Sequence, residues 1–308
     1  MATGSGPGQP EATAVLGAGY ELAPRTASSL VRLGRLARKK PLGAISVVVI
    51  VVMLFAGIFA DVVAPFDPLE AHVRDRLQGP SFTYLMGTDN LGRDVFSRVI
   101  HGARTSLLVA IPAVAIGVGI GSLIGIMSGF LGGWFDLIVQ RFLDASQAIP
   151  SLILALAVIA ILGAGIDKVI YVIAFIAVPW NGRVVRGAVL AIKENQYIDA
   201  ARAVGASNRR IMFRHILPNV VAPILVLISV LLGAAIIIEA SLSFLGLGVP
   251  PPSPSWGGML SREGRTFMEK VPTLALFPGM AISIVVLAFN MLGDTLRDIW
   301  DPRLRGSQ

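Results

Sequence analysis

The sequence predicts an all-α fold, a polytopic membrane protein built as a bundle of six transmembrane helices. Its composition points to a membrane protein, since 54% of the 308 residues are hydrophobic and only 15% are charged. A soluble domain of this length needs more charge to cover its surface. Apolar runs of about 20 residues, the length that crosses a bilayer, also recur along the chain. They place the predicted spans at 42–62, 105–127, 141–162, 168–190, 219–240 and 272–293.

The third and fourth predicted spans carry polar interruptions. The third begins with RFLDASQAIPS at 141–151, which brings Asp144, Gln147 and Pro150 into an otherwise apolar run. Arg141 and Asp144 are three residues apart, so they share a helical face and can pair with each other. The fourth span is interrupted by PWNGR at 179–183.

The distribution of basic residues predicts the orientation in the membrane. Lysines and arginines gather before the first span, between the fourth and fifth spans, and after the last span. Cytoplasmic loops carry an excess of these residues, and an even number of spans returns the chain to the same side. Both termini are therefore expected in the cytoplasm. The segment 63–104 then lies outside, and its arginines can pair with Asp67, Glu70, Asp75, Asp89 and Asp94.

These features predict a division of the chain into five parts. A disordered, basic cytoplasmic segment (1–41) precedes the first transmembrane helix (42–62) and an extracytoplasmic segment (63–104). A transmembrane domain (105–297) follows, with cytoplasmic helices at 195–217 and an extracytoplasmic loop at 241–271, and then a cytoplasmic tail (298–308). Within that loop, GLGVPPPSPSWGG at 246–258 is not expected to be helical, because prolines remove backbone donors and favour extended geometry in the residues before them.

The composition argues against several classes of function. There is no cysteine, which excludes disulfides and thiol catalysis. His72, His101 and His215 are scattered and form no helical pair, so no metal site is expected. The net charge of +7 is explained by the cytoplasmic bias of lysine and arginine, so no nucleic-acid partner is expected.

A polar, basic insert at 193–218 separates the fourth and fifth spans. Asn195 is a predicted N-cap for a helix over 196–204, which Gly205 ends in a left-handed conformation. Ser207 caps a second helix that runs to about Leu217, and Pro218 breaks the chain before the fifth span.

Small side chains lie on one face of the first of these helices. Tyr197, Ala200, Ala201 and Val204 share this face through their helical spacing, and Asp199 and Arg202 flank it. Such a face lets another protein approach closely. An ordinary cytoplasmic pair of helices, with alanines present only for helix propensity, explains the spacing equally well.

The insert resembles the cytoplasmic coupling signature of bacterial ATP-binding cassette (ABC) importer permeases. That signature is Glu-Ala-Ala, three residues, Gly, nine residues, then Ile-x-Leu-Pro, and the chain has DAARAVGASNRRIMFRHILP at 199–218. Asp199 replaces the signature's Glu, and His215 replaces its first Ile. The resemblance implies an ATPase-coupling role for Tyr197, Asp199, Ala200, Ala201, Gly205, Leu217 and Pro218.

Three further stretches resemble the peptide/nickel subfamily of these permeases. They are GTDNLGRDVFSRVIHGARTSL at 87–107, EASLSFLGLGVPPPSPSWGGML at 239–260 and FPGMAISIVVLAFNMLGDTLRDIWDPRL at 277–304. Together with the insert, they make the chain most similar to the second (C-type) permease of dipeptide or oligopeptide importers. The implied fold is that of a type I ABC importer permease.

The resemblance implies a function and a set of partners. The chain is expected to form half of the translocation pathway of an ATP-driven importer for di- or oligopeptides in the bacterial cell membrane, with nickel chelates or glutathione as alternative substrates. Expected partners are a second, B-type permease, two ATPase subunits or one fused ATPase, an extracytoplasmic peptide-binding protein and membrane lipid. ATP and Mg²⁺ are expected on the ATPases, and no cofactor on this chain, which has no GxxxxGK[ST] phosphate loop.

Polar residues in the spans are candidates for the translocation pathway, because buried polar groups in a membrane usually face a cavity or a partner. The candidates are Asp144, Gln147, Asn181, Arg183, Glu239 and Asn290. Phe244, Leu245 and Trp256 are candidates for an outer gate or a binding-protein contact, although tryptophan is also common as an interfacial anchor.

Two other classes of function remain as alternatives. A membrane-embedded hydrolase needs a catalytic pair, and neither HExxH nor GxSxG nor a GxGD-like aspartate pair occurs in the chain. We therefore expect no catalytic residues. A structural scaffold predicts that the chain has no effect on ATP hydrolysis by its partners.

Overall fold

The computed structural model describes residue 38 and residues 40–300. Residues 40–300 fall within one compact unit, 40–308. They form helices and no strand, apart from a single antiparallel bridge between Thr88 and Asp94. Most of the predicted disordered segment 1–41, and residues 301–308 of the predicted tail, lie outside the described residues.

Five helical runs in the described part are long and apolar enough to cross a membrane. They are α2 (Pro41–Ile58), α4 (Val95–Leu131), α7 (Ile166–Lys193), the run Asn208–Phe244, and α13 (Thr273–Trp300). A bent pair, α5 (Gly133–Gln147) and α6 (Ser151–Leu162), gives six spans if it is counted as one. The predicted six-helix membrane bundle is therefore confirmed.

The third span differs from the prediction. It was expected as one helix over 141–162, but α5 begins at Gly133 and meets α6 at an angle of 86°. The break lies just before Pro150, which is the extended N-cap of α6 with φ −53° and ψ 130°. Proline also disfavours helical geometry in the residue before it, so the chain turns at Ile149.

The fourth span differs in the opposite direction, because α7 runs unbroken through the predicted PWNGR interruption. Asn181 is buried, and its Nδ2 donates to the carbonyl oxygen of Val118 and to Ser122 Oγ, both at 2.9 Å. The Nδ2 donor thus finds partners on α4 within an unbroken helix, while the Asn181 Oδ1 atom has no hydrogen-bond partner among the described residues.

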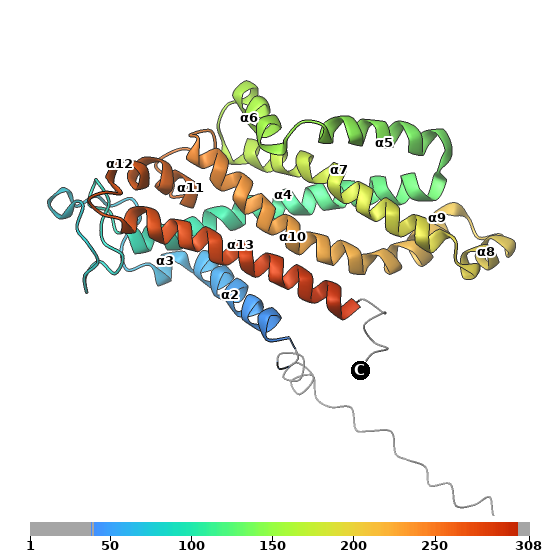
Figure 1. Cartoon of the computed structure of the whole chain (residues 1–308), viewed down its shortest axis with the longest axis horizontal. Helices are drawn as coiled ribbons and strands as arrows, with labels where there is room; N and C mark the ends of the chain where they lie inside the picture. Colours follow the sequence, from blue (N-terminus) through green and yellow to red (C-terminus); the bar gives the residue numbers. More distant parts are fainter. Residues whose placement is uncertain (1–37, 39, 301–308) are drawn as a thin grey trace, which may run out of the picture. The chain divides into compact units, whose positions relative to one another are not determined.

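Helices α4 and α7 pack through glycines spaced four residues apart. A Cβ placed at Gly117 would lie 2.7 Å from the carbonyl oxygen of Ala174, and one at Gly125 would lie 2.5 Å from that of Gly182. Small residues at this spacing let membrane helices approach backbone to backbone. The two helices run side by side through the middle of the bundle (Figure 1).

Helix α4 begins ten residues earlier than the predicted start at 105. Asp94 caps it, because its Oδ2 accepts from the backbone N of Ser97 at 2.7 Å. The expected pairing of acidic and basic residues before the span is confirmed for Asp89, whose Oδ2 lies 2.6 Å from Arg93 Nε. Asp75 instead accepts from Gln78 Nε2 and Tyr84 Oη.

The remaining elements are short pieces between the spans, together with α10, which forms most of the run Asn208–Phe244. They are α3 (Ala60–Val63), η1 (Val73–Asp75), α8 (Gln196–Ala203), α9 (Asn208–Ile211), the π-helical turn η2 (Met212–Ile216), α10 (Leu217–Phe244), α11 (Trp256–Met259), the π-helical turn η3 (Leu260–Gly264) and α12 (Arg265–Phe267). Helices α8 and α9 lie at one end of the bundle, and α11 and α12 lie at the other (Figure 1).

Two predicted boundaries around α10 are wrong. Pro218 does not break the chain, because α9, η2 and α10 follow one another without a gap. The N–H of Leu217 bonds to the carbonyl oxygen of Met212, five residues back, and Pro218 then occupies the first turn of α10, where no N–H is needed. The predicted loop 241–271 is also partly helical, since α10 extends to Phe244 and α11 starts at Trp256.

Candidate coupling surface, loop network and membrane cavity

Three isoleucines hold the insert between α7 and α10 in place. Ile198 of α8, Ile211 of α9 and Ile216 of η2 are each 0% exposed and share a cluster with Val185 and Phe130. Lys193 at the end of α7 adds a polar tie, since its Nζ donates to the Phe130 carbonyl oxygen at 2.9 Å. The insert is therefore packed onto the ends of α4 and α7.

The opposite side of α8 is open. Tyr197, Ala200, Ala203 and Val204 are exposed, and we call these four residues the coupling surface. Val204, the C-cap of α8, is 84% exposed, a large exposure for an apolar side chain. Ala201, expected on the same face, is instead half-buried against the isoleucine cluster. Asp199 and Arg202 pair with each other at 3.2 Å beside the surface.

The turn between α8 and α9 follows the prediction. Gly205 has φ +80°, the left-handed conformation that favours glycine, and nothing lies within 4 Å of the position that a Cβ would take. Ser207 Oγ accepts from the backbone N of Arg210 at 3.4 Å, as expected of an N-cap. Asn195 stands at the N-cap of α8, but its side chain donates back to the Ile192 carbonyl oxygen and does not cap the helix.

His215, which stands where the signature has isoleucine, lies beside the coupling surface. Its ring is 6.3 Å from the Tyr197 ring, and its carbonyl oxygen accepts from Asn219 Nδ2 at 2.6 Å. The neighbouring Ile216 takes the buried position. Leu217 is half-buried against the isoleucine cluster, and Pro218 is exposed.

At the other end of α10 a buried hydrogen-bond network joins α4, α10 and the following loop. Glu239 is 0% exposed, and its carboxyl group accepts from Ser243 Oγ at 2.8 Å and from Ser106 Oγ at 3.3 Å. Ser243 Oγ also accepts from the backbone N of Val249 in the loop, at 3.1 Å. The loop is thus tied to α10 through Ser243, and Glu239 links that serine to Ser106 on α4.

Trp256, a candidate for the outer gate or a binding-protein contact, lies inside the protein. Its side chain is among the buried residues, and its indole Nε1 donates to the Val99 carbonyl oxygen at 2.9 Å. Gly102 makes room for it, since a Cβ there would lie 2.6 Å from the indole ring. Trp256 is therefore packed against α4, whereas Phe244 and Leu245 are exposed.

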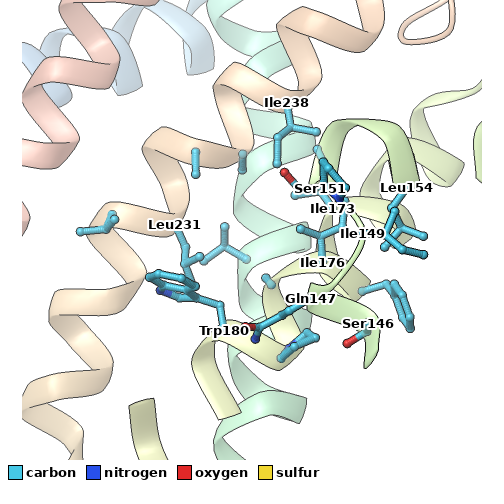
Figure 2. A pocket seen from close by; sticks show the side chains of 18 residues that line it. Ser146, Gln147, Ile149, Ser151, Leu154, Ile173, Ile176, Trp180, Leu231 and Ile238 are labelled. Carbon is cyan, nitrogen blue, oxygen red and sulfur yellow. The ribbon is translucent and has the colours of Figure 1, made fainter. Parts of the chain in front are cut away.

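An apolar cavity of about 420 Å³ lies between α6, α7 and α10. The bend between α5 and α6 forms one wall through Gln147, Pro150 and Ser151. Figure 2 shows the Gln147 side chain beside that of Trp180, with Leu231 projecting from α10. Among the predicted pathway residues, Gln147 alone lines this cavity.

The other predicted pathway residues have partners or lie elsewhere. Asp144 Oδ1 is 2.5 Å from Arg183 Nη2 on α7, a closer contact than the expected pair with Arg141 at 4.0 Å. Asn181 and Glu239 are buried between helices, as described above. Asn290 is exposed on α13.

Two ion pairs that the sequence reasoning missed tie helices together. Arg186 on α7 holds Asp136 on α5 through two contacts of 2.6 Å, and Arg104 on α4 holds Asp61 with a closest contact of 2.8 Å. The hydrogen bonds from Arg104, and then from His101, hold the pKa of Asp61 below its usual value. A charge in an otherwise apolar span, as at Arg186, is the signal that could have indicated the first pair.

Comparison with protein families gives matches along most of the chain. Residues 121–306 match the family described as binding-protein-dependent transport system inner membrane component. Residues 34–80 match the N-terminal TM domain of oligopeptide transport permease C.

Named relatives match over nearly their whole length. The chain is 42% identical over 268 residues to the dipeptide transport system permease protein DppC of Alkalihalophilus pseudofirmus, covering 87% of this chain and 88% of that protein. It is 45% identical over 257 residues to the glutathione transport system permease protein GsiD of Pectobacterium atrosepticum, covering 83% and 85%.

Among solved structures, an inward-facing MetNI methionine ABC transporter chain matches with a TM-score of 0.56 and 20% identity, covering 66% of this chain and 97% of that chain. This likeness supports the fold alone. The multi-pass helical bundle, the two family matches and the relatives lead to one assignment. The chain belongs to the family of binding-protein-dependent transport system inner membrane components, as an ABC importer permease of the dipeptide/oligopeptide group.

Proposed function

We propose that this permease imports short peptides and receives the ATP-driven movement through the coupling surface on α8. The observation that supports the coupling role most directly is the division of the insert into two sides. Its isoleucines are buried against α4 and α7, while Tyr197, Ala200 and Val204 face outward. A rigidly packed element with an open face can transmit a push from a docked protein to the helices beneath it.

The same proposal assigns partners and orientation. Two ATPase subunits, or one fused ATPase, dock on the coupling surface and bind ATP and Mg²⁺, and this chain performs no hydrolysis itself. A second, B-type permease completes the pathway, and an extracytoplasmic binding protein delivers the peptide. The end of the bundle that carries α8 faces the cytoplasm together with both termini, and the end that carries α11 faces outward.

The substrate is proposed to be a di- or oligopeptide, with glutathione as the second candidate. Relatives of both kinds match at almost the same identity, 42% for the dipeptide permease and 45% for the glutathione permease. Glutathione is itself a small peptide, so both candidates present amide groups to the pathway. Nickel chelates are a further candidate that the sequence motifs leave open.

A bulky side chain on the coupling surface tests the ATPase contact. Ala200→Trp fills the space that a docked partner needs, so ATP hydrolysis stimulated by loaded binding protein is expected to fall at least tenfold in the reconstituted complex. The matched control is Ala164→Trp, an exposed alanine in the loop between α6 and α7, which should leave stimulation unchanged. Equal stimulation in both variants would contradict the docking role.

Two further variants separate charge from shape at the same place. Asp199→Lys reverses an exposed charge beside the surface, and Gly205→Val places a branched side chain at a left-handed position. Both should insert into the membrane normally and lose stimulated hydrolysis.

Competition among a dipeptide, glutathione and a nickel chelate for uptake by the wild-type complex identifies the substrate.

A further inference from the structure

We propose that the cavity beside the α5–α6 bend binds one residue of the transported peptide, with Gln147 donating a hydrogen bond to a peptide carbonyl or carboxylate oxygen. This inference rests on the proposed peptide-import function and identifies a contact of this chain with the substrate. Four features support it: the depth of the cavity, an unpaired donor, the irregular backbone at the bend, and the apolar walls.

The cavity lies at mid-depth in the bundle. Its lining residues Val114, Pro179 and Leu231 come from near the midpoints of α4, α7 and α10. A cavity of about 420 Å³ falls in the range of roughly 300–1,000 Å³ that is typical of small-molecule sites. A solute that crosses the membrane has to pass this depth.

Gln147 places an unpaired donor at the cavity. Its Nε2 atom is buried and has no hydrogen-bond partner in the described part of the protein. Asn181, another buried amide of the spans, differs in its donor, because its Nδ2 has two partners on α4, whereas its Oδ1 acceptor has none in the described part. A buried donor without a partner costs about 1–3 kcal/mol, and a ligand that brings an acceptor oxygen removes this cost.

The bend supplies further hydrogen-bond donors, the backbone N–H groups at the start of α6. Helix α6 begins at Ser151 without a side-chain cap, so the N–H groups of its first turn lack helical partners. Non-helical backbone at membrane depth is tolerated where it lines a cavity, and the N-terminal ends of interrupted helices attract anionic or carbonyl groups. Pro150 and Ser151 line the same cavity as Gln147.

The rest of the wall suits an apolar side chain. Ile173 and Ile176 of α7 face Leu231 and Ile238 of α10, and the cavity has few polar atoms besides those at the bend (Figure 2). Donors on one side and aliphatic groups on the other match a residue that carries a carbonyl oxygen and an apolar side chain. A wholly apolar occupant, such as a lipid acyl chain, would leave the Gln147 donor unpaired.

The test uses the complete importer in proteoliposomes and two substrates, Ala-Ala and Phe-Ala. Ala234→Leu narrows the cavity from α10 and is expected to reduce Phe-Ala uptake at least tenfold relative to Ala-Ala uptake. Ala222→Leu, at a half-buried alanine of the same helix that does not line the cavity, should keep the wild-type ratio.

Gln147→Met keeps the length of the side chain and removes the donor. Uptake of both dipeptides is expected to fall about three- to tenfold, while ATP hydrolysis without binding protein stays unchanged. Gln140→Met, which removes an amide of the same helix that bonds Ser128 outside the cavity, is the control for loss of a hydrogen bond elsewhere. Suppose that the wild-type complex takes up both dipeptides. If Gln147→Met and Ala234→Leu then match the wild type, or if Ala234→Leu slows both substrates equally, as displacement of a lipid would, the proposed site is wrong. The import function stands in either case. If wild-type complex takes up no dipeptide, both proposals fail.

Discussion

At one end of α10 the chain is held by aliphatic packing, and at the other end by hydrogen bonds. The α8–α9 insert rests on Ile198, Ile211 and Ile216 and keeps its polar residues outside. The loop after α10 rests on the buried Glu239–Ser243–Val249 network and on the Trp256 indole. Both segments carry family motifs: the insert leaves Tyr197, Asp199 and Ala200 exposed, whereas the loop end buries Glu239 and Trp256 and exposes Phe244 and Leu245. A motif therefore identifies a segment, and burial decides whether its residues face a partner or the interior.

The difference predicts that the loop end is sensitive to loss of its buried aromatic group. Trp256→Ala removes a buried indole and leaves the Val99 carbonyl oxygen without its side-chain donor, so unfolding free energy should fall by about 3–5 kcal/mol. Thermal denaturation of purified protein in detergent measures this loss. Trp134→Ala, at an 80% exposed tryptophan, is the control, and an equal loss in both variants would show that Trp256 is not an anchor.

The insert end should respond more weakly to a change of one methyl group. Ile198→Val removes a methyl group from the isoleucine cluster and is expected to cost about 0.5–1.5 kcal/mol. Because α8 then packs less firmly, stimulated ATP hydrolysis should fall along with stability. Val204→Ala, on the exposed side, should leave the melting temperature unchanged. A lower melting temperature for Val204→Ala would contradict the assignment of the two sides.

The smallest effect on stability is expected at the ion pair between Asp61 of α3 and Arg104 of α4. The Arg104 hydrogen bond lowers the pKa of Asp61, so the pair contributes stability above the unfolded-state pKa of about 3.9 and loses it as pH falls through the lower folded-state pKa. The melting temperature of Asp61→Asn should therefore lie slightly below wild type at pH 6, and the gap should narrow progressively as the pH is lowered below about 3.9. A gap that is constant with pH would mean that the charge of Asp61 contributes nothing.

Three prolines show how far the sequence alone could predict the fold. Pro150, Pro179 and Pro218 all suggested interruptions, and only the first breaks a span. Pro179 lies where α7 packs on α4, and Pro218 follows a π-turn that provides the preceding hydrogen bond. Each proline is the same signal in the sequence, and the contacts with neighbouring helices and turns decide whether the helix is interrupted there.

The candidate sites divide in a similar way. Gly205 and Ser207 act through backbone conformation and capping, which depend on adjacent residues, so their structural roles were predictable. The burial of Trp256 depends on Gly102, which is distant in the sequence but packs against the indole ring. Gln147 Nε2 is unpaired because α7 and α10 place no acceptor atom within its reach. Such long-range complementarity leaves no mark in a single sequence.

The gapless run from α9 through η2 to α10 has a consequence for how motion crosses the bilayer. Its 37 residues, at about 1.5 Å per residue, make a rod about 55 Å long, against a hydrocarbon layer of about 30 Å. A tilt of about 5° around the middle of such a rod displaces each tip by about 2 Å in opposite directions. Movement of the α9 tip toward the bundle axis would therefore swing Ser243 and the segment it holds away from that axis, so a single helix can couple opposite movements at the two ends of the bundle.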